Sequence, residues 1–172
     1  MKRHLSIILA LFLILPVFGC GYRFAPAGEN MGREIKAVYI DRFINHTSEA
    51  HVENYVRNAF INQFIRGNRF KSAYKKETSD AVLSGKITGL STSHVSYERN
   101  DMAREDTVSI SLDVEFKDSE GNILWAKKSL PGREAYRIDD NPTITSKNRK
   151  EALIKLSEDL AEKTYRDIMS GF

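Results

Sequence analysis

The chain has 172 residues, 41% of them hydrophobic, and its 26 basic and 23 acidic side chains give a formal net charge of +3. This length allows one domain with a substantial core, and the nearly balanced charge argues against a nucleic-acid-binding protein. The only cysteine is Cys20, which excludes an internal disulfide.

The first residues have the pattern of a secretory signal peptide. Lys2 and Arg3 precede an uncharged apolar run that is too short to span a membrane, which takes about 20 apolar residues. Val17-Phe18-Gly19-Cys20 is similar to the lipobox of bacterial lipoproteins. We therefore expect cleavage after Gly19 and covalent attachment of acyl and diacylglycerol groups to Cys20; the alternative is an ordinary signal peptide with an incidental cysteine.

Acylation would anchor the chain to a membrane while the polypeptide stays in water, since each buried methylene contributes about 0.8 kcal/mol. No other cofactor is expected. The predicted organisation is a signal peptide at 1–19, a lipidated tether at 20–34 rich in glycine, and a single α+β domain at 35–172. Without the signal peptide the formal charge falls to +1, because 24 basic residues then face 23 acidic ones.

The first predicted elements are a strand and a helix. Ile35–Phe43 has an apolar centre with hydrophobic residues on both faces, which is typical of an interior strand. Ala50–Arg66 carries its apolar residues at helical spacing. Thr47 or Ser48 can cap this helix, and Gly67 suits the position just past its end.

The middle of the chain predicts strands. Phe70–Lys76 is a candidate short edge strand, and Ala81–Tyr97 is a long strand in which Gly85 or Gly89 can mark a bulge. From Asp106 to Phe116 apolar and polar residues alternate strictly, so one face is expected to be buried and the other exposed to water or a partner.

The last elements are a returning strand and a second helix. A hairpin loop at Asp118–Asn122 leads into a strand at Ile123–Leu130, which Pro131-Gly132 is expected to end. After an irregular stretch, Ser146–Met169 has a helical apolar stripe. The order predicts an α+β two-layer sandwich, a mostly antiparallel sheet of four to five strands with two helices on one face.

No catalytic or metal-binding arrangement emerges from the sequence. His46 and His51 do not share a helix face, so a metal site there is not expected. His94 lies on a strand without a carboxylate partner that the sequence reveals, so no triad can be argued. We therefore expect a protein that is not an enzyme.

Two features favour binding. Arg99 and Arg104 lie in a charged segment between the two best strands, and with Lys127 and Lys128 on the neighbouring strand they could form a cationic cluster that binds phosphate. The alternative is a solvated loop whose acidic residues balance the arginines. The polar residues of the alternating strand, Thr107, Ser109 and Ser111 among them, also suit a polar protein interface, although such a face can simply serve solubility.

Together these features resemble the LPS-assembly lipoprotein LptE family. Cys20–Phe24 reads Cys-Gly-Tyr-Arg-Phe and is the most specific piece; the strand at Ile35–Phe43 with its following helix and the closing segment Glu151–Glu162 are similar too. The resemblance implies a two-layer α+β fold, a lipid anchor on the periplasmic side of the outer membrane, and a β-barrel partner, LptD, in which the lipoprotein sits as a plug. It also implies lipopolysaccharide as a ligand. Gly21 after the cysteine agrees with sorting to the outer membrane.

Arg99, Arg104, Lys127 and Lys128 are candidate lipopolysaccharide contacts from local charge and not from a family motif. The alternative function is another outer-membrane lipoprotein, an adaptor associated with the cell wall or with a secretion channel. A lipid-anchored enzyme is the weakest hypothesis, because no acid, base and nucleophile converge in the sequence.

Overall fold

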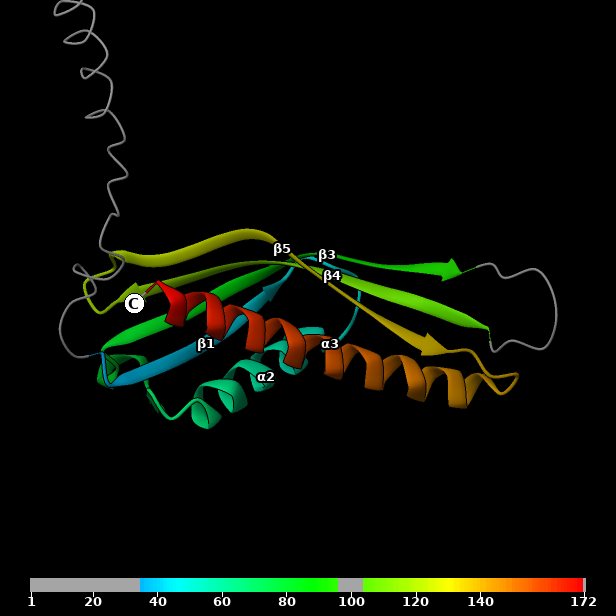
Figure 1. Ribbon diagram of the computed structural model, residues 1–172, viewed down its shortest axis with the longest axis horizontal. Helices are drawn as coiled ribbons and strands as arrows, with labels where there is room; N and C mark the ends of the chain where they lie inside the picture. The colour runs from blue at the N-terminus through cyan, green and yellow to red at the C-terminus, as the bar shows by residue number, and fades with distance from the viewer. Residues whose placement is uncertain (1–34, 96–103, 172) are drawn as a thin grey trace, which may run out of the picture.

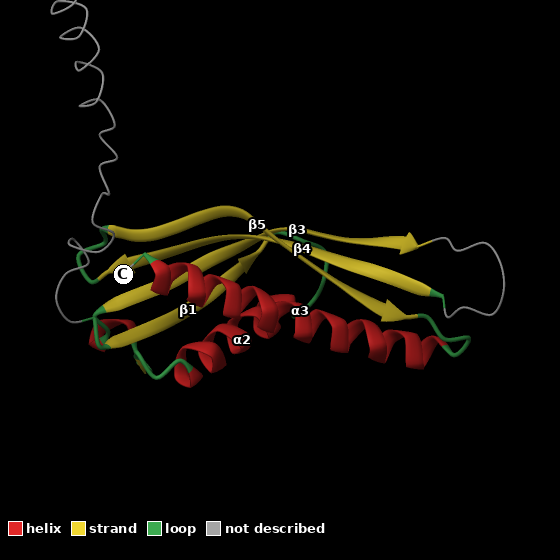
Figure 2. Ribbon diagram, in the orientation of Figure 1, coloured by secondary structure: helices red, strands yellow, loops and turns green. Residues whose placement is uncertain are grey.

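The computed structural model describes residues 35–95 and 104–171, which form one sheet covered by helices on one side (Figures 1 and 2). Its elements in chain order are β1 (Ala37–Asn45), α2 (Val52–Arg66), β2 (Lys71–Ser72), the 3-10 helix η2 (Lys76–Thr78), β3 (Ala81–Val95), β4 (Glu105–Asp118), β5 (Ile123–Arg137) and α3 (Pro142–Ser170). The strand order is β2-β1-β3-β4-β5. Strand β1 runs parallel to β2 and β3, and β3, β4 and β5 form an antiparallel meander.

The predicted two-layer α+β sandwich is confirmed, with five strands and with both helices on one face. The sheet is mixed because α2 carries the chain from β1 back across the sheet, so the next strand of full length, β3, lies parallel to β1. Strands β3 and β4 extend beyond the N-terminal end of α2 in Figure 1, and the first half of α3 accompanies them there.

The buried layer follows the predicted periodicities. Every second residue of β4 from Val108 to Phe116 is at most 2% exposed, and the apolar stripe of α2 is buried against the sheet. Where α2, α3 and the sheet meet, aromatic rings form a cluster made of Phe64, Phe70, Phe116 and Tyr165. This cluster is the junction that joins the two helices to the strands.

Helix α2 begins differently from the prediction. His51 is its N-cap, with a left-handed φ of 67°, and no side chain caps the helix, so the expected cap by Thr47 or Ser48 is wrong. Thr47 instead donates its hydroxyl proton to Asn45 Oδ1 at 2.8 Å. Gly67 does follow the helix, as predicted. A glycine is needed there because a Cβ would lie 2.3 Å from the Tyr165 ring.

Strand β5 is longer than predicted, because it continues through Pro131 and Gly132 to Arg137. β5 is an edge strand, where a proline is tolerated if its nitrogen points away from the sheet. A Cβ on Gly132 would lie 2.6 Å from Leu156, so the glycine lets α3 pack closely. Before them, Ser129 has a φ of 51° at a register shift, and its N–H donates to Asp113 Oδ1 at 2.8 Å.

The second helix starts earlier than expected, at Pro142 instead of Ser146. Asn141 caps it, since its side chain accepts a hydrogen bond from the N–H of Thr143 at 2.9 Å. Pro142 fits the first turn, where the missing N–H has no helical partner to lose. The residues predicted as an irregular stretch therefore supply the helix start.

Two smaller predictions have mixed outcomes. The edge strand expected at Phe70–Lys76 shrinks to the two residues of β2. The register of β3 against β4 shifts between Ile87 and Gly89, so Gly89 marks the bulge. Gly85 is explained by close packing instead of a bulge, because a Cβ there would lie 2.5 Å from the Phe43 ring.

Candidate interaction surface

The side of the sheet away from the helices, called here the open face, is polar along its length. On β4 its residues are Thr107, Ser109, Ser111, Asp113, Glu115 and Lys117, all half-buried. The two cross-strand partners Ser91 and Ser93 on β3 extend the hydroxyl-rich part. This confirms the predicted polar side of the alternating strand, and no described helix covers it (Figure 2).

A hollow of about 500 Å³ lies in the charged half of the open face. Four strands contribute to it. Its lining includes Arg42, Ile44, Lys86, Asp113, Glu115 and Lys128. The hollow therefore has a mixed-charge lining that also includes the apolar side chain of Ile44.

Two of the three acidic groups of the hollow have partners elsewhere on the sheet, and the third, Asp41, accepts the N–H of Arg42 at 2.7 Å. Asp113 accepts the Ser129 N–H, and Glu115 forms an ion pair with Lys117 that holds the pKa of the Glu115 carboxyl below its usual value. Within the described ranges, no carboxylate lies within ion-pair distance of Arg42, Lys86 or Lys128. The hollow thus presents cationic side chains to an incoming anionic group.

The four candidate contacts predicted from the sequence do not form one cluster. Arg104 pairs with Asp140 at 2.6 Å, while Lys127 pairs with Asp167 of α3 at 2.8 Å. Lys127 is the cross-strand partner of Val114, ten residues along β4 from Arg104, or about 30 Å at the rise of a strand. Lys127 and Lys128 both line the hollow, and Arg99 lies outside the described residues.

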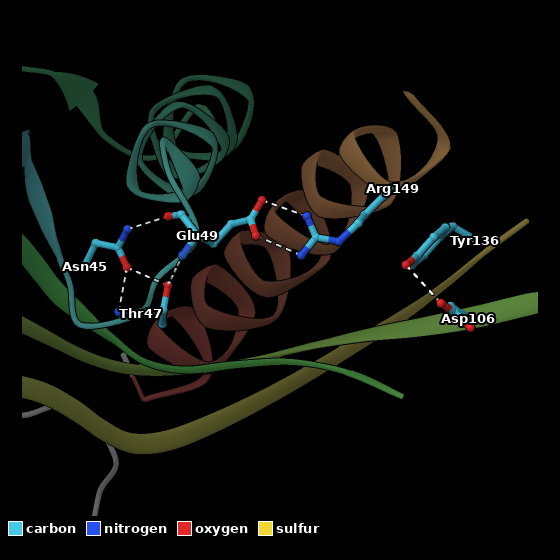
Figure 3. A network of polar contacts seen from close by, with 6 residues as sticks. All are labelled: Asn45, Thr47, Glu49, Asp106, Tyr136 and Arg149. Carbon is cyan, nitrogen blue, oxygen red and sulfur yellow. Dashed lines mark hydrogen bonds and ion pairs between the residues drawn. The ribbon is translucent and has the colours of Figure 1, made fainter. Parts of the chain in front are cut away.

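A second polar group, on the helix side, was not predicted (Figure 3). The guanidinium of Arg149 in α3 donates two hydrogen bonds, of 2.7 and 2.8 Å, to the carboxylate of Glu49. Asn45 at the end of β1 donates to the backbone oxygen of Glu49 at 2.8 Å. These contacts join the loop before α2 to α3, and the hydrogen bonds from Arg149 lower the pKa of Glu49.

Replacing Glu49 by glutamine is expected to lower the free energy of unfolding at pH 7 by about 1–2 kcal/mol, because it removes a charge-assisted pair that is only partly exposed. The pKa of Glu49 is lower in the folded chain than in the unfolded one. The pair therefore stabilises the fold above the unfolded-state pKa, and this contribution is lost as the pH falls through the lowered value.

Urea unfolding of the wild type and the variant between pH 3 and pH 7 measures this effect. The difference in the free energy of unfolding between the two proteins should become smaller as the pH falls. Glu151→Gln is the matched control, since its pair with Lys147 is exposed and 3.8 Å long, and it should change stability by less than about 0.5 kcal/mol. If the difference in the free energy of unfolding between wild type and Glu49→Gln did not change with pH, the stabilising role assigned to the Glu49–Arg149 pair would be contradicted.

His94 does have a carboxylate partner, although none could be inferred from the sequence. Its Nδ1 lies 2.7 Å from Asp106 Oδ1, because the two residues are directly opposite on β3 and β4. Tyr136 on β5 donates to the other oxygen of Asp106 at 3.3 Å (Figure 3). Burial raises the pKa of Tyr136. The contacts among His94, Asp106 and Tyr136 thus link β3, β4 and β5 near the end of β3 and the start of β4.

Two further findings concern the described part of the chain. It contains no group of three or more His, Cys, Asp or Glu residues placed to hold a metal ion. None of its helices combines the length and the apolar character needed to cross a membrane.

Comparisons with known proteins agree on the architecture. The sequence profile described as "LptE: Lipopolysaccharide-assembly" matches residues 35–168. A candidate lipoprotein from Caulobacter crescentus CB15 has a similar structure, with 13% identity, a TM-score of 0.51, and 76% of this chain and 88% of that chain covered. A hypothetical protein from Chlamydia trachomatis is 8% identical, with a TM-score of 0.50, and 80% of this chain and 95% of that chain covered. No curated protein matches the chain.

Proposed function

This chain belongs to the LptE family of lipopolysaccharide-assembly proteins, and we propose that it acts at the outer membrane as a lipid-anchored plug for a β-barrel translocon of the LptD type. Cys20 carries the anchor in this proposal, and the domain faces the periplasm. It works by binding and not by catalysis.

The observation that carries the proposal is the polar open face. A protein held inside a barrel whose interior is polar must offer hydrogen-bonding surface to the wall, because an unpaired polar group buried at the contact costs about 1–3 kcal/mol. The hydroxyls of Thr107, Ser109 and Ser111 can donate and accept in any direction. Small side chains also let a wall approach the sheet closely.

The second support is the distribution of cations. Arg42, Lys86 and Lys128 face the same hollow without an ion-pair partner among the described residues, so this part of the open face suits acidic groups of the barrel wall or of its loops. Lipopolysaccharide phosphates are a further ligand in this proposal, with Arg99, Arg104, Lys127 and Lys128 as candidate contacts. Because Arg104 and Lys127 lie far apart, they would act as separate contacts.

Ser109→Arg places a long charged side chain in the centre of the hydroxyl-rich strip and is expected to reduce recovery of the barrel at least about tenfold, equivalent to about 1.4 kcal/mol of binding. The chain is co-expressed with LptD, extracted in mild detergent and purified by a tag on the chain. The barrel in the eluate is then quantified.

Ser146→Arg is the matched control, because Ser146 is an exposed serine on α3 in the helix layer. It should leave recovery unchanged. Equal recovery with both variants would exclude the open face as the contact. Recovery of the wild type as a free monomer would reject the barrel partner, and binding to purified cell wall or assembly into rings would favour the adaptor function instead.

A further inference from the structure

Strand β5 forms one edge of the sheet, and its two halves differ in how they are protected. The half before Gly132 has features that prevent an edge strand from pairing with a strand of another chain. These are two exposed lysines, Ser129 with a left-handed φ at a register shift, and Pro131. The half from Arg133 to Arg137 has no proline and no register shift.

The direction of the backbone groups follows from one hydrogen bond. Ile138 N–H donates to the Arg104 carbonyl oxygen at 2.8 Å, so alternate residues back along β5, such as Tyr136 and Glu134, direct their backbone groups toward β4. The N–H and C=O groups of Arg133 and Ala135 therefore point outward, as does the Arg137 N–H. Among the residues that the structure describes, the Arg137 carbonyl is the one outward group with a partner, accepting from Asn148 at 2.9 Å.

A groove of about 350 Å³ runs beside these outward groups, between β5 and α3. Its lining includes Glu134, Tyr136, Asn148, Ala152 and Lys155. A strand added to this edge would place every second side chain in the groove, near the small Ala152, and the others on the open face beside Arg133 and Arg137.

We propose that Arg133–Arg137 of β5 is a β-augmentation site that takes an extended segment of the barrel partner, with acidic side chains opposite Arg133 and Arg137 and small side chains at the alternate positions that enter the groove. This rests on the proposed function. Open backbone groups supply the hydrogen bonds and the groove supplies side-chain selection. The arginines specify the charge, because carboxylates opposite Arg133 and Arg137 are favourable cross-strand pairs.

Pairing with β5 of a second copy is disfavoured in the register centred on Ala135. Antiparallel pairing of two β5 strands about Ala135 would set Arg133 opposite Arg137 of the other copy. Like charges directly opposite one another destabilise a sheet. The two arginines therefore favour an acidic segment over β5 of a second copy in this register.

Ala135→Pro tests the proposal, because it removes an outward N–H and leaves the ladder to β4 intact, as Pro131 already does two pairs away. Ala135→Ser is the matched control and keeps the N–H. In the co-expression with LptD, the proline variant should lose at least about tenfold in recovered barrel, as expected for lost strand hydrogen bonds, and the serine variant should match the wild type.

Amide hydrogen exchange of the wild type, alone and in the complex, gives an independent result should the proline variant not fold. The amides of Arg133, Ala135 and Arg137 should exchange at least about tenfold more slowly in the complex. Unchanged exchange, or full recovery with a folded Ala135→Pro variant, would overturn this site while leaving the plug function in place. If the wild type recovers no barrel, the proposed function itself fails.

Discussion

Phe64→Ala is expected to lower the free energy of unfolding by about 3–5 kcal/mol, the range for removing a large aromatic side chain from a packed core. Phe64 is 1% exposed, and its ring centroid lies 5.1 Å from that of Tyr165 and 5.7 Å from that of Phe70. These neighbours belong to α3 and to the segment before β2, and a third ring, Phe116 on β4, lies 6.4 Å away. The cavity left behind would border three separate elements, which cannot all collapse into it.

Denaturant unfolding monitored by circular dichroism measures this decrease in the free energy of unfolding. Tyr74→Ala is the control, because Tyr74 is an aromatic side chain that is 97% exposed, and it should change stability by less than about 0.5 kcal/mol. A loss of under about 1 kcal/mol for Phe64→Ala would show that the aromatic cluster does not join the helices to the sheet as described.

Cys20→Ala is expected to move the protein from the membrane fraction to the soluble periplasmic fraction. Cys20 lies outside the described residues, and the expectation comes from the lipobox-like sequence. Each buried methylene contributes about 0.8 kcal/mol, so loss of two or more acyl chains abolishes lasting attachment. Fractionation of cells followed by detection of the protein measures the change.

The same variant should unfold at the wild-type temperature, because the substitution changes none of the residues in the described sheet and helices, which begin at Ala37. Intact-mass analysis of the wild-type protein provides the second measurement. A mature N-terminus without acyl groups, or firm membrane attachment of Cys20→Ala, would reject the anchor and with it the proposed plug at the outer membrane.

Local periodicity was enough to predict the layers of this fold. The alternation in Asp106–Phe116 and the apolar stripes of the two helices depend on residues close in sequence, and each stripe is buried in the structure. The polar side of the alternating strand was predicted in the same way and became the open face. Such patterns indicate which side of a helix or strand is buried, and this side can be predicted without knowing which other elements pack against it.

Element boundaries were predicted less well, because proline was taken only as a breaker. Pro131 lies within β5 and Pro142 within the first turn of α3. A proline is acceptable wherever its missing N–H has no partner to lose, at a sheet edge or at a helix start. Whether a strand is an edge strand depends on the order of the strands, which the local pattern does not contain.

By itself, then, the sequence determined the fold class, the buried and exposed faces and the family resemblance. Only the tertiary structure decided the strand order, the pairing of Glu49 with Arg149 one hundred positions away, and the separation of Arg104 from Lys127. It also decided that Arg133–Arg137 lies at an open edge beside a groove. The physical reason is that the polarity of a face is a property of one segment, whereas charge clusters and free edges arise from how distant segments pair.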